Sequence, residues 1–210
     1  MGRRRLSPSD RQLGTIEDTA SARAFADSLT KAEISIGRRT SISGAIQYAI
    51  PLFNDNGYEG TRRVIDISGD GANNSGTLVG LARDVAIEHG ITINGLPIVN
   101  HRPNRFGFPQ LKDLDEYYFH CVVGGTGAFI VVAHGFDAFA QAIHRKLILE
   151  IAGRMPPTSR DVAKRSTSGR HQPLLHLAAT TAPSTTYSPG CDVGERRMWE
   201  FLKGRGWSPF

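Results

Sequence analysis

The hydrophobic and polar positions of this chain of 210 residues change character near residue 153. Before that point, apolar residues recur at the spacing of strands or helices. After it, the chain is rich in Ser, Thr and Pro and keeps no apolar period. Because such a composition cannot bury a core, we expect a disordered, low-complexity tail at 154–210. Two short, isolated helices are expected within it, at 171–179 and 196–202.

The pattern before residue 153 predicts strands that alternate with helices. Three apolar runs are typical of buried strands, and five stretches have helical spacing. Alternation of this kind predicts right-handed crossovers and a mostly parallel sheet with helices on both faces. The expected class is therefore α/β, a partial doubly wound, Rossmann-like sheet, since three strands are fewer than the usual number of about five or six. The expected strands are 62–68, 91–99 and 128–133, and the expected helices are 20–29, 42–53, 77–90, 114–121 and 136–151.

Composition divides the chain into three expected parts. Residues 1–18 have no clear period, residues 19–153 form the partial α/β domain, and residues 154–210 form the tail. The net charge of +5 belongs to the carboxyl-terminal part, because residues 1–152 hold 16 basic and 16 acidic side chains. A basic tail is weak evidence for a nucleic-acid-binding domain, so we do not expect nucleic acid as a partner. Binding of an acidic partner by the tail stays an alternative.

The chain carries few signals of a cell compartment or of a cysteine framework. No apolar run approaches the length of about 18 residues that spans a membrane, so no membrane span is expected. The basic start has no apolar segment behind it and is not a secretory signal, which predicts a cytoplasmic protein for the chain as written. Cys121 and Cys191 show neither metal-ligand spacing nor a disulfide framework, and Cys121 is expected to be a buried apolar residue.

The main candidate for chemistry is the turn that ends the strand at 62–68. Every residue from Ser68 to Asn74 favours a turn or offers an oxygen, and Asp70 contributes a carboxylate. Open α/β sheets present ligand-binding groups at this carboxyl edge. The same pattern also fits a plain connecting loop in which Asp70 and Asn74 cap the next helix. The residues alone leave both interpretations open.

Several of these runs resemble the von Willebrand factor A-type domain. The resemblance covers about residues 15–153 and is closest to an uncharacterised bacterial branch that carries a domain-of-unknown-function label. In that fold a metal ion, usually magnesium, sits at the carboxyl edge in a metal-ion-dependent adhesion site. By position, the resemblance implies Thr40 and Asp70 as metal ligands. The matching runs are 39–46, 62–74, 90–98, 117–125, 128–133 and 146–153.

The resemblance implies a non-enzymatic module that uses Mg²⁺ or Mn²⁺ to bind a protein partner supplying a carboxylate. One departure affects this expectation: the family's Asp-x-Ser-x-Ser motif does not precede Thr40. We therefore expect a truncated copy with an incomplete metal site, inactive if the missing strand is truly absent. The family branch also implies export of the protein if the true start lies upstream.

A second function class remains open, a hydrolase-like α/β enzyme that uses Asp66 or Asp70 as acid, base or nucleophile. It would need another charged or His side chain at the same place. Asp66 lies inside an apolar strand, so we expect instead a structural carboxylate paired with Arg62 or Arg63. The sequence contains no serine nucleophile elbow, phosphate loop or zinc-spaced pair of histidines, and we do not expect an enzyme.

Overall fold

The computed structural model describes residues 14–32, 37–104, 106–152, 175–177 and 187–204. It consists of two compact units, residues 1–37 and residues 38–210. The first unit contains helix α1 (Thr19–Lys31), which corresponds to the helix expected at 20–29. The carboxylate of Asp18 caps this helix, because it accepts a hydrogen bond of 2.8 Å from the backbone N–H of Ser21.

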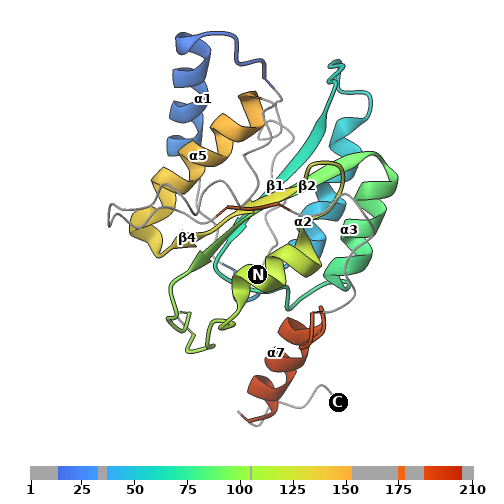
Figure 1. Ribbon diagram of the computed structural model, residues 1–210, viewed down its shortest axis with the longest axis vertical. Helices are drawn as coiled ribbons and strands as arrows, with labels where there is room; N and C mark the ends of the chain where they lie inside the picture. Colours follow the sequence, from blue (N-terminus) through green and yellow to red (C-terminus); the bar gives the residue numbers. More distant parts are fainter. Residues whose placement is uncertain (1–13, 33–36, 105, 153–174, 178–186, 205–210) are drawn as a thin grey trace, which may run out of the picture. The chain divides into compact units, whose positions relative to one another are not determined.

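The second unit is built on a mostly parallel sheet. Its strands follow the order β1, β2, β3, β5, and β4 also pairs with β2. The pairs of β1 with β2 and of β2 with β3 are parallel, whereas β5 runs antiparallel to β3. With helices flanking this sheet, the expected α/β class is confirmed (Figure 1). The strands are β1 (Arg63–Gly69), β2 (Ile91–Val99), β3 (Phe129–Val131), β4 (Ala133–His134) and β5 (Leu175–Leu177).

Helices cover both faces of the sheet (Figure 1). One face packs against α2 (Ile42–Ala49), which continues as the 3₁₀ turn η2 (Ile50–Phe53), and against α3 (Val79–Glu88). The opposite face packs against α5 (Phe139–Ala152), which follows the short turn η4 (Phe136–Ala138). Because both faces are covered, all nine residues of β2 are buried.

Alternate residues of the strands enter two separate apolar clusters. In β2, Ile91 and Ile93 join the cluster under α2 and α3, while Leu96 and Ile98 join the cluster under α5. In β1, Ile65 and Ile67 also point toward α2 and α3. The side chain between them, Asp66, therefore faces α5, where a carboxylate needs polar partners.

A short π-helical segment closes the first of these clusters. Helix α4 (Leu114–Tyr117) runs directly into the π-helix η3 (Tyr118–Val122), and both tyrosines at the junction are fully buried. Gly95 of β2 permits this close packing. A Cβ atom there would lie 2.8 Å from the Val123 side chain and 3.1 Å from the Tyr118 ring.

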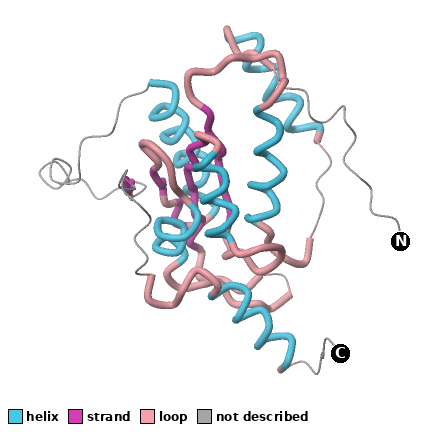
Figure 2. Tube along the Cα trace, turned by 90° about the vertical axis from the view of Figure 1, so that its right-hand side faces the viewer, coloured by secondary structure: helices cyan, strands magenta, loops and turns pink. Residues whose placement is uncertain are grey.

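The carboxyl-terminal region departs from the expected disordered tail in two places. Leu175 to Leu177 form strand β5, so the helix expected at 171–179 is wrong at these residues, because they pair with β3. The helix expected at 196–202 is present as α7 (Val193–Lys203). It is not isolated, because it lies beside the loops at one end of the sheet (Figure 2). Residues 187–192, which lead into α7, are described as well, and the expected tail at 154–174, 178–186 and 205–210 lies outside the described residues.

The two cysteines form a disulfide bond, for which the sequence offers no framework. Cys121 is buried as expected, but it is one half of this bond and not a free apolar residue. Cys121 and Cys191 are 70 residues apart in the chain, but their Cα atoms lie 5.4 Å apart. The folded chain brings residues 187–204 next to the buried π-helix η3. The spacing of the two cysteines in the sequence does not predict this contact. Among the described helices, none is long and apolar enough to cross a membrane.

Two glycine substitutions should have opposite effects on stability. Gly95→Ala forces a methyl group against Val123 and Tyr118, so we expect the free energy of unfolding to fall by about 1–3 kcal/mol. Gly80→Ala places a methyl group on α3 with only the Arg83 side chain near it, at 3.8 Å. It should raise the free energy of unfolding by about 0.5–1 kcal/mol. Urea unfolding of both variants measures the difference, and equal effects would contradict the packing of Gly95.

Candidate functional site

The structure brings the two predicted metal ligands, Thr40 and Asp70, to neighbouring loops. Thr40 lies two residues before the first residue of α2, and Asp70 directly follows the last residue of β1. The Thr40 hydroxyl lies so close to Gly71 that a Cβ atom on that glycine would be 3.2 Å from it. The Thr40 and Asp70 loops therefore meet at the carboxyl edge of the sheet, where a parallel sheet usually presents its binding groups.

The side chains of Asn73 and Asn74 hold these two loops together. The Thr40 N–H donates to Asn74 Oδ1 at 2.8 Å, and the Asn74 N–H donates back to the Thr40 carbonyl at 2.9 Å. The Ser43 N–H donates to Asn73 Oδ1 at 3.0 Å. Both asparagines are buried, so they organise the loop and do not face solvent as ligands.

The serines on either side of the start of α2 have different roles. Ser41 caps the helix, because its hydroxyl accepts a hydrogen bond of 3.3 Å from the Gly44 N–H. Ser43 is a buried residue of the first turn, 0% exposed. Its hydroxyl donates to the Ser75 carbonyl at 3.5 Å. Ser43 therefore ties α2 to the loop that follows Asp70.

A third loop reaches Asp70 through Gln110. The Gln110 side-chain amide donates to the carbonyl oxygens of Asp70 and Ile98, both at 2.8 Å. The Asp70 carboxylate itself belongs to an exposed residue. It lies near the buried Tyr118, whose pKa is raised by burial, by Tyr117 and by the negative charge of Asp70. This edge therefore offers one free carboxylate on a backbone that is fixed by its neighbours.

Helix α7 contacts the same edge from the carboxyl-terminal side. Glu195 Oε1 accepts a hydrogen bond of 2.7 Å from the Asn73 side chain. Gly194 allows this approach, because a Cβ atom there would overlap with the carbonyl oxygen of Asn73. The Arg197 guanidinium donates to the carbonyl of Pro109 at 3.1 Å. The helix thus contacts two of the loops that surround Asp70.

The side chains that this edge offers do not form a complete set of ligands for a divalent cation. Thr40 offers a hydroxyl and Asp70 a carboxylate. Among the described residues, no group of three His, Cys, Asp or Glu side chains could hold a metal ion. Magnesium commonly keeps several waters and takes one or two carboxylates. Water and a partner would therefore have to supply most of the ligands.

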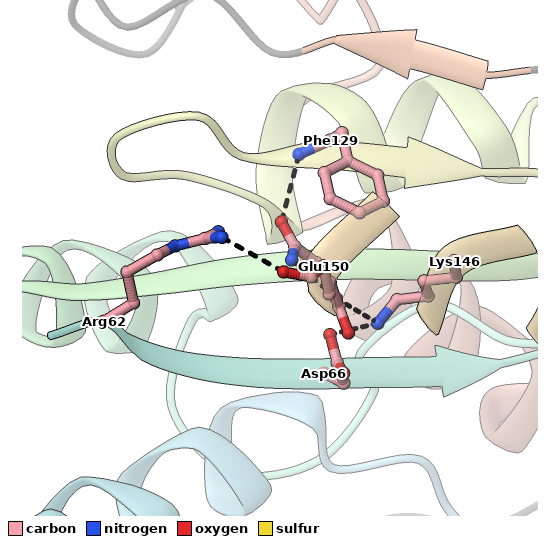
Figure 3. A network of polar contacts seen from close by, with 6 residues as sticks. Arg62, Asp66, Phe129, Lys146 and Glu150 are labelled. Carbon is pink, nitrogen blue, oxygen red and sulfur yellow. Dashed lines mark hydrogen bonds and ion pairs between the residues drawn. The ribbon is translucent and has the colours of Figure 1, made fainter. Parts of the chain in front are cut away.

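A second polar cluster lies under α5, in the middle of the sheet (Figure 3). Lys146 of α5 forms ion pairs with Asp66 of β1 and with Glu150 one turn later, the latter at 2.8 Å. Asn94, the register partner of Asp66 on β2, donates to Glu150 Oε1 at 2.7 Å. The Asn94 side chain also accepts from the Phe129 N–H at 3.2 Å. The cluster joins three strands to one helix.

Burial and shared protons shift the pKa values in this cluster. Burial raises the pKa of Asp66 to about 6, and a hydrogen bond between its carboxyl group and that of Glu150 adds to the rise. Burial would also raise the pKa of Glu150, but hydrogen bonds from Asp66, Lys146 and Asn94 outweigh it and lower the pKa. One lysine therefore stabilises two neighbouring carboxyl groups, and Asp66 is the group that holds a proton more readily.

Sequence reasoning found part of this arrangement. It placed Asp66 in a structural ion pair, which is confirmed, but the expected partners Arg62 and Arg63 are wrong. The partner is Lys146, 80 residues away in sequence, and Arg62 instead donates to the Glu150 backbone carbonyl at 3.4 Å (Figure 3). A lysine and a glutamate four residues apart on an apolar helix were the available signal for this cluster.

The fold and both clusters define an α/β domain with a mostly parallel sheet and a polar carboxyl edge. A comparison with protein-family models matches residues 12–155 to the family described as "Protein of unknown function (DUF1194)". The chain belongs to this family. No curated protein and no solved structure matches it. The domain-of-unknown-function assignment is thereby confirmed, and the von Willebrand factor A likeness stays a prediction.

The raised pKa of Asp66 predicts a pH-dependent stability. Because its pKa in the folded state, about 6, is above the ordinary value of 3.8, its contribution is fully present below about pH 4 and is lost as the pH rises through 6. Asp66→Asn should thus be about as stable as the wild type at pH 4. At pH 7 it should be more stable by about 1 kcal/mol, a value reduced for solvent screening because the Asp66 side chain is 39% exposed.

Urea unfolding at pH 4, 5, 6 and 7 measures this difference. The two proteins should diverge steadily between pH 4 and 6. A constant difference across the series would contradict a raised pKa for Asp66.

Removing the lysine should be costly, because Lys146 is almost fully buried with two carboxyl groups beside it. Lys146→Met should lower the free energy of unfolding at pH 7 by about 3 kcal/mol, near the low end for a broken buried pair. In the double variant with Asp66→Asn, one of the two carboxylates is gone, so part of the loss should be recovered. Strict additivity of the two substitutions, measured by thermal unfolding, would show that the three groups are not coupled.

Proposed function

We propose that this chain is a non-enzymatic protein-binding module of the von Willebrand factor A type, and that its partner contacts the carboxyl edge of the sheet. The observation that carries the proposal is the contact between the loops of Thr40 and Asp70. Asn74 joins these loops by hydrogen bonds in both directions, so their geometry is set before a partner arrives. A preformed edge with one free carboxylate suits recognition of a polar group.

A divalent cation, Mg²⁺ or Mn²⁺, is part of this proposal. The Thr40 hydroxyl and the Asp70 carboxylate would be two of its ligands, and a carboxylate of the partner protein would be another. The cation supplies the positive charge that lets two carboxylates meet at one place. Because no Asp-x-Ser-x-Ser motif precedes Thr40, we expect weak affinity for the free cation, on the order of 1 mM.

Titration calorimetry with MgCl₂ and MnCl₂ tests the cation step. The wild-type protein should release or absorb heat on binding, and Asp70→Asn and Thr40→Ala should each weaken the binding at least tenfold. Asp137→Asn is the matched control, because it removes an exposed carboxylate from the turn before α5. No heat from a folded protein at 10 mM cation, or equal binding by Asp70→Asn, would overturn this part of the proposal.

The hydrolase-like enzyme is the second candidate, and one observation favours it. Asp66 has a charged partner in contact, a pKa of about 6 and a side chain that is 39% exposed, which suits a general acid or base near neutral pH. Asp70 has no such arrangement in the described part of the chain. Hydrolysis of general ester or phosphomonoester substrates that Asp66→Asn abolishes would support the enzyme, and inactivity of the wild type would count against it.

A further inference from the structure

The segment 187–204 is attached to the domain by a disulfide bond, by polar contacts and by apolar packing. Tyr187 and Val193 belong to the core cluster under α2 and α3, and Met198 is buried. The covalent bond is the disulfide between Cys191 and Cys121. The Tyr187 hydroxyl donates to Asp113 Oδ2 at 2.8 Å, and the Asn73 amide and the Pro109 carbonyl bind Glu195 and Arg197. Phe201 adds an edge-to-face contact with Phe108, with ring centroids 5.2 Å apart.

The contact made by Glu195 is only partly satisfied. Its Oε1 atom accepts from Asn73, but Oε2 is buried without a hydrogen-bond partner among the described groups. A buried carboxylate oxygen without a partner is costly, so this contact stabilises the attached segment less than a complete pair would. The disulfide adds a covalent link to these contacts and to the apolar packing of the segment.

The two sulfur atoms of this bond differ in their surroundings. Cys121 is fully buried in η3, whereas Cys191 is partly exposed. The buried guanidinium of Arg83 donates to the carbonyl oxygens of His120 and Cys121, at 2.8 and 3.3 Å. The same guanidinium is paired with the Asp84 carboxylate at 2.8 Å, so its charge is balanced locally. The difference between the two sulfurs is therefore one of exposure, and an incoming thiolate should attack the sulfur of the more exposed Cys191.

From this asymmetry we infer that Cys121–Cys191 is a thiol–disulfide exchange site whose reduction by a dithiol releases segment 187–204 from the carboxyl edge. A thiolate of the dithiol attacks Cys191 Sγ, the protein S–S bond breaks, and Cys121 leaves as a thiolate that then takes a proton. The second thiol of the reductant attacks the mixed disulfide and frees Cys191. The dithiol becomes a disulfide, and the protein gains two electrons and two protons.

Release has a structural consequence because α7 has only 11 residues. A helix of this length is marginal in water without packing, so the released α7 should unfold. The same step uncovers Asn73 and Tyr117, next to the loops of Thr40 and Asp70. The exchange reaction and the release stand on their own, and only the meaning of the uncovered edge rests on the proposed function.

Hydrogen exchange measured by mass spectrometry tests the release in the full chain. The protein is incubated with dithiothreitol at pH 7.5 without denaturant, and free thiols are counted in parallel. We expect two thiols per chain and an exchange rate at least tenfold higher for the peptides covering Val193–Lys203. Peptides covering strand β2, buried along its whole length, are the internal control and should keep their rate.

A double variant makes the test independent of the reductant. Cys121→Ala with Cys191→Ala should show the fast exchange of α7 without dithiothreitol, while β2 stays protected. The rate of reduction of the wild type should rise with the thiolate fraction of the reductant, because the thiolate is the attacking species.

Two outcomes would overturn the inference. If no thiols appear while β2 stays protected, the bond is closed to exchange. If two thiols appear but α7 keeps its slow exchange, the other contacts hold α7 in place and reduction does not release it. Calorimetry with MgCl₂ on the oxidised and reduced proteins tests cation binding, whereas hydrogen exchange tests the release of α7. The absence of cation binding and the absence of release therefore give different results.

Discussion

The carboxyl edge of this domain depends on the hydrogen bonds of one buried side chain, Asn73. Its amide accepts from the start of α2 at Ser43 and donates to the carbonyl of Thr77, just before α3. It also donates to Glu195 of α7, and its backbone N–H donates to the Tyr117 hydroxyl at 3.2 Å. An amide offers both donors and acceptors, and few other side chains could satisfy so many fixed groups at once. Asn73 therefore links α2, α3, α4 and α7 to one another.

The opposite side of the sheet is organised by charge as well as by apolar packing. Near β3, Ala142 of α5 packs in the same apolar cluster as Phe129 of the strand. Apolar contacts of this kind do not fix one position of the helix on the sheet. Near β1, Lys146 and Glu150 pair with Asp66 and Asn94 in fixed geometry. A rotation or a slip of α5 would separate these groups and leave buried charges without partners, which is far more costly than a shift of apolar contacts. The polar half of the interface thus determines where the helix sits.

The parts of the fold that could be predicted are those whose cause is local in the sequence. Strands β1 and β2 were predictable because each is rich in β-branched residues and follows or precedes turn residues, even though Asp66 and Asn94 interrupt the apolar runs. The loop after β1 was recognisable as a polar edge from Asp70 and Asn74 alone. Strand β5 was not predictable, since three residues inside a polar region give no period and their strand character comes from pairing with β3. The pairs Cys121–Cys191 and Asp66–Lys146 join distant positions, which only the folded chain brings together.

The disulfide also has a consequence for how such proteins vary by descent. The family match ends at residue 155, so Cys121 lies inside the shared domain and Cys191 lies beyond it. Gly194 is beyond it too, and its missing side chain matters only if α7 rests on Asn73. The disulfide and the bare backbone at Gly194 both serve this one segment. We therefore expect relatives that have the segment to carry Cys121, Cys191 and Gly194 together.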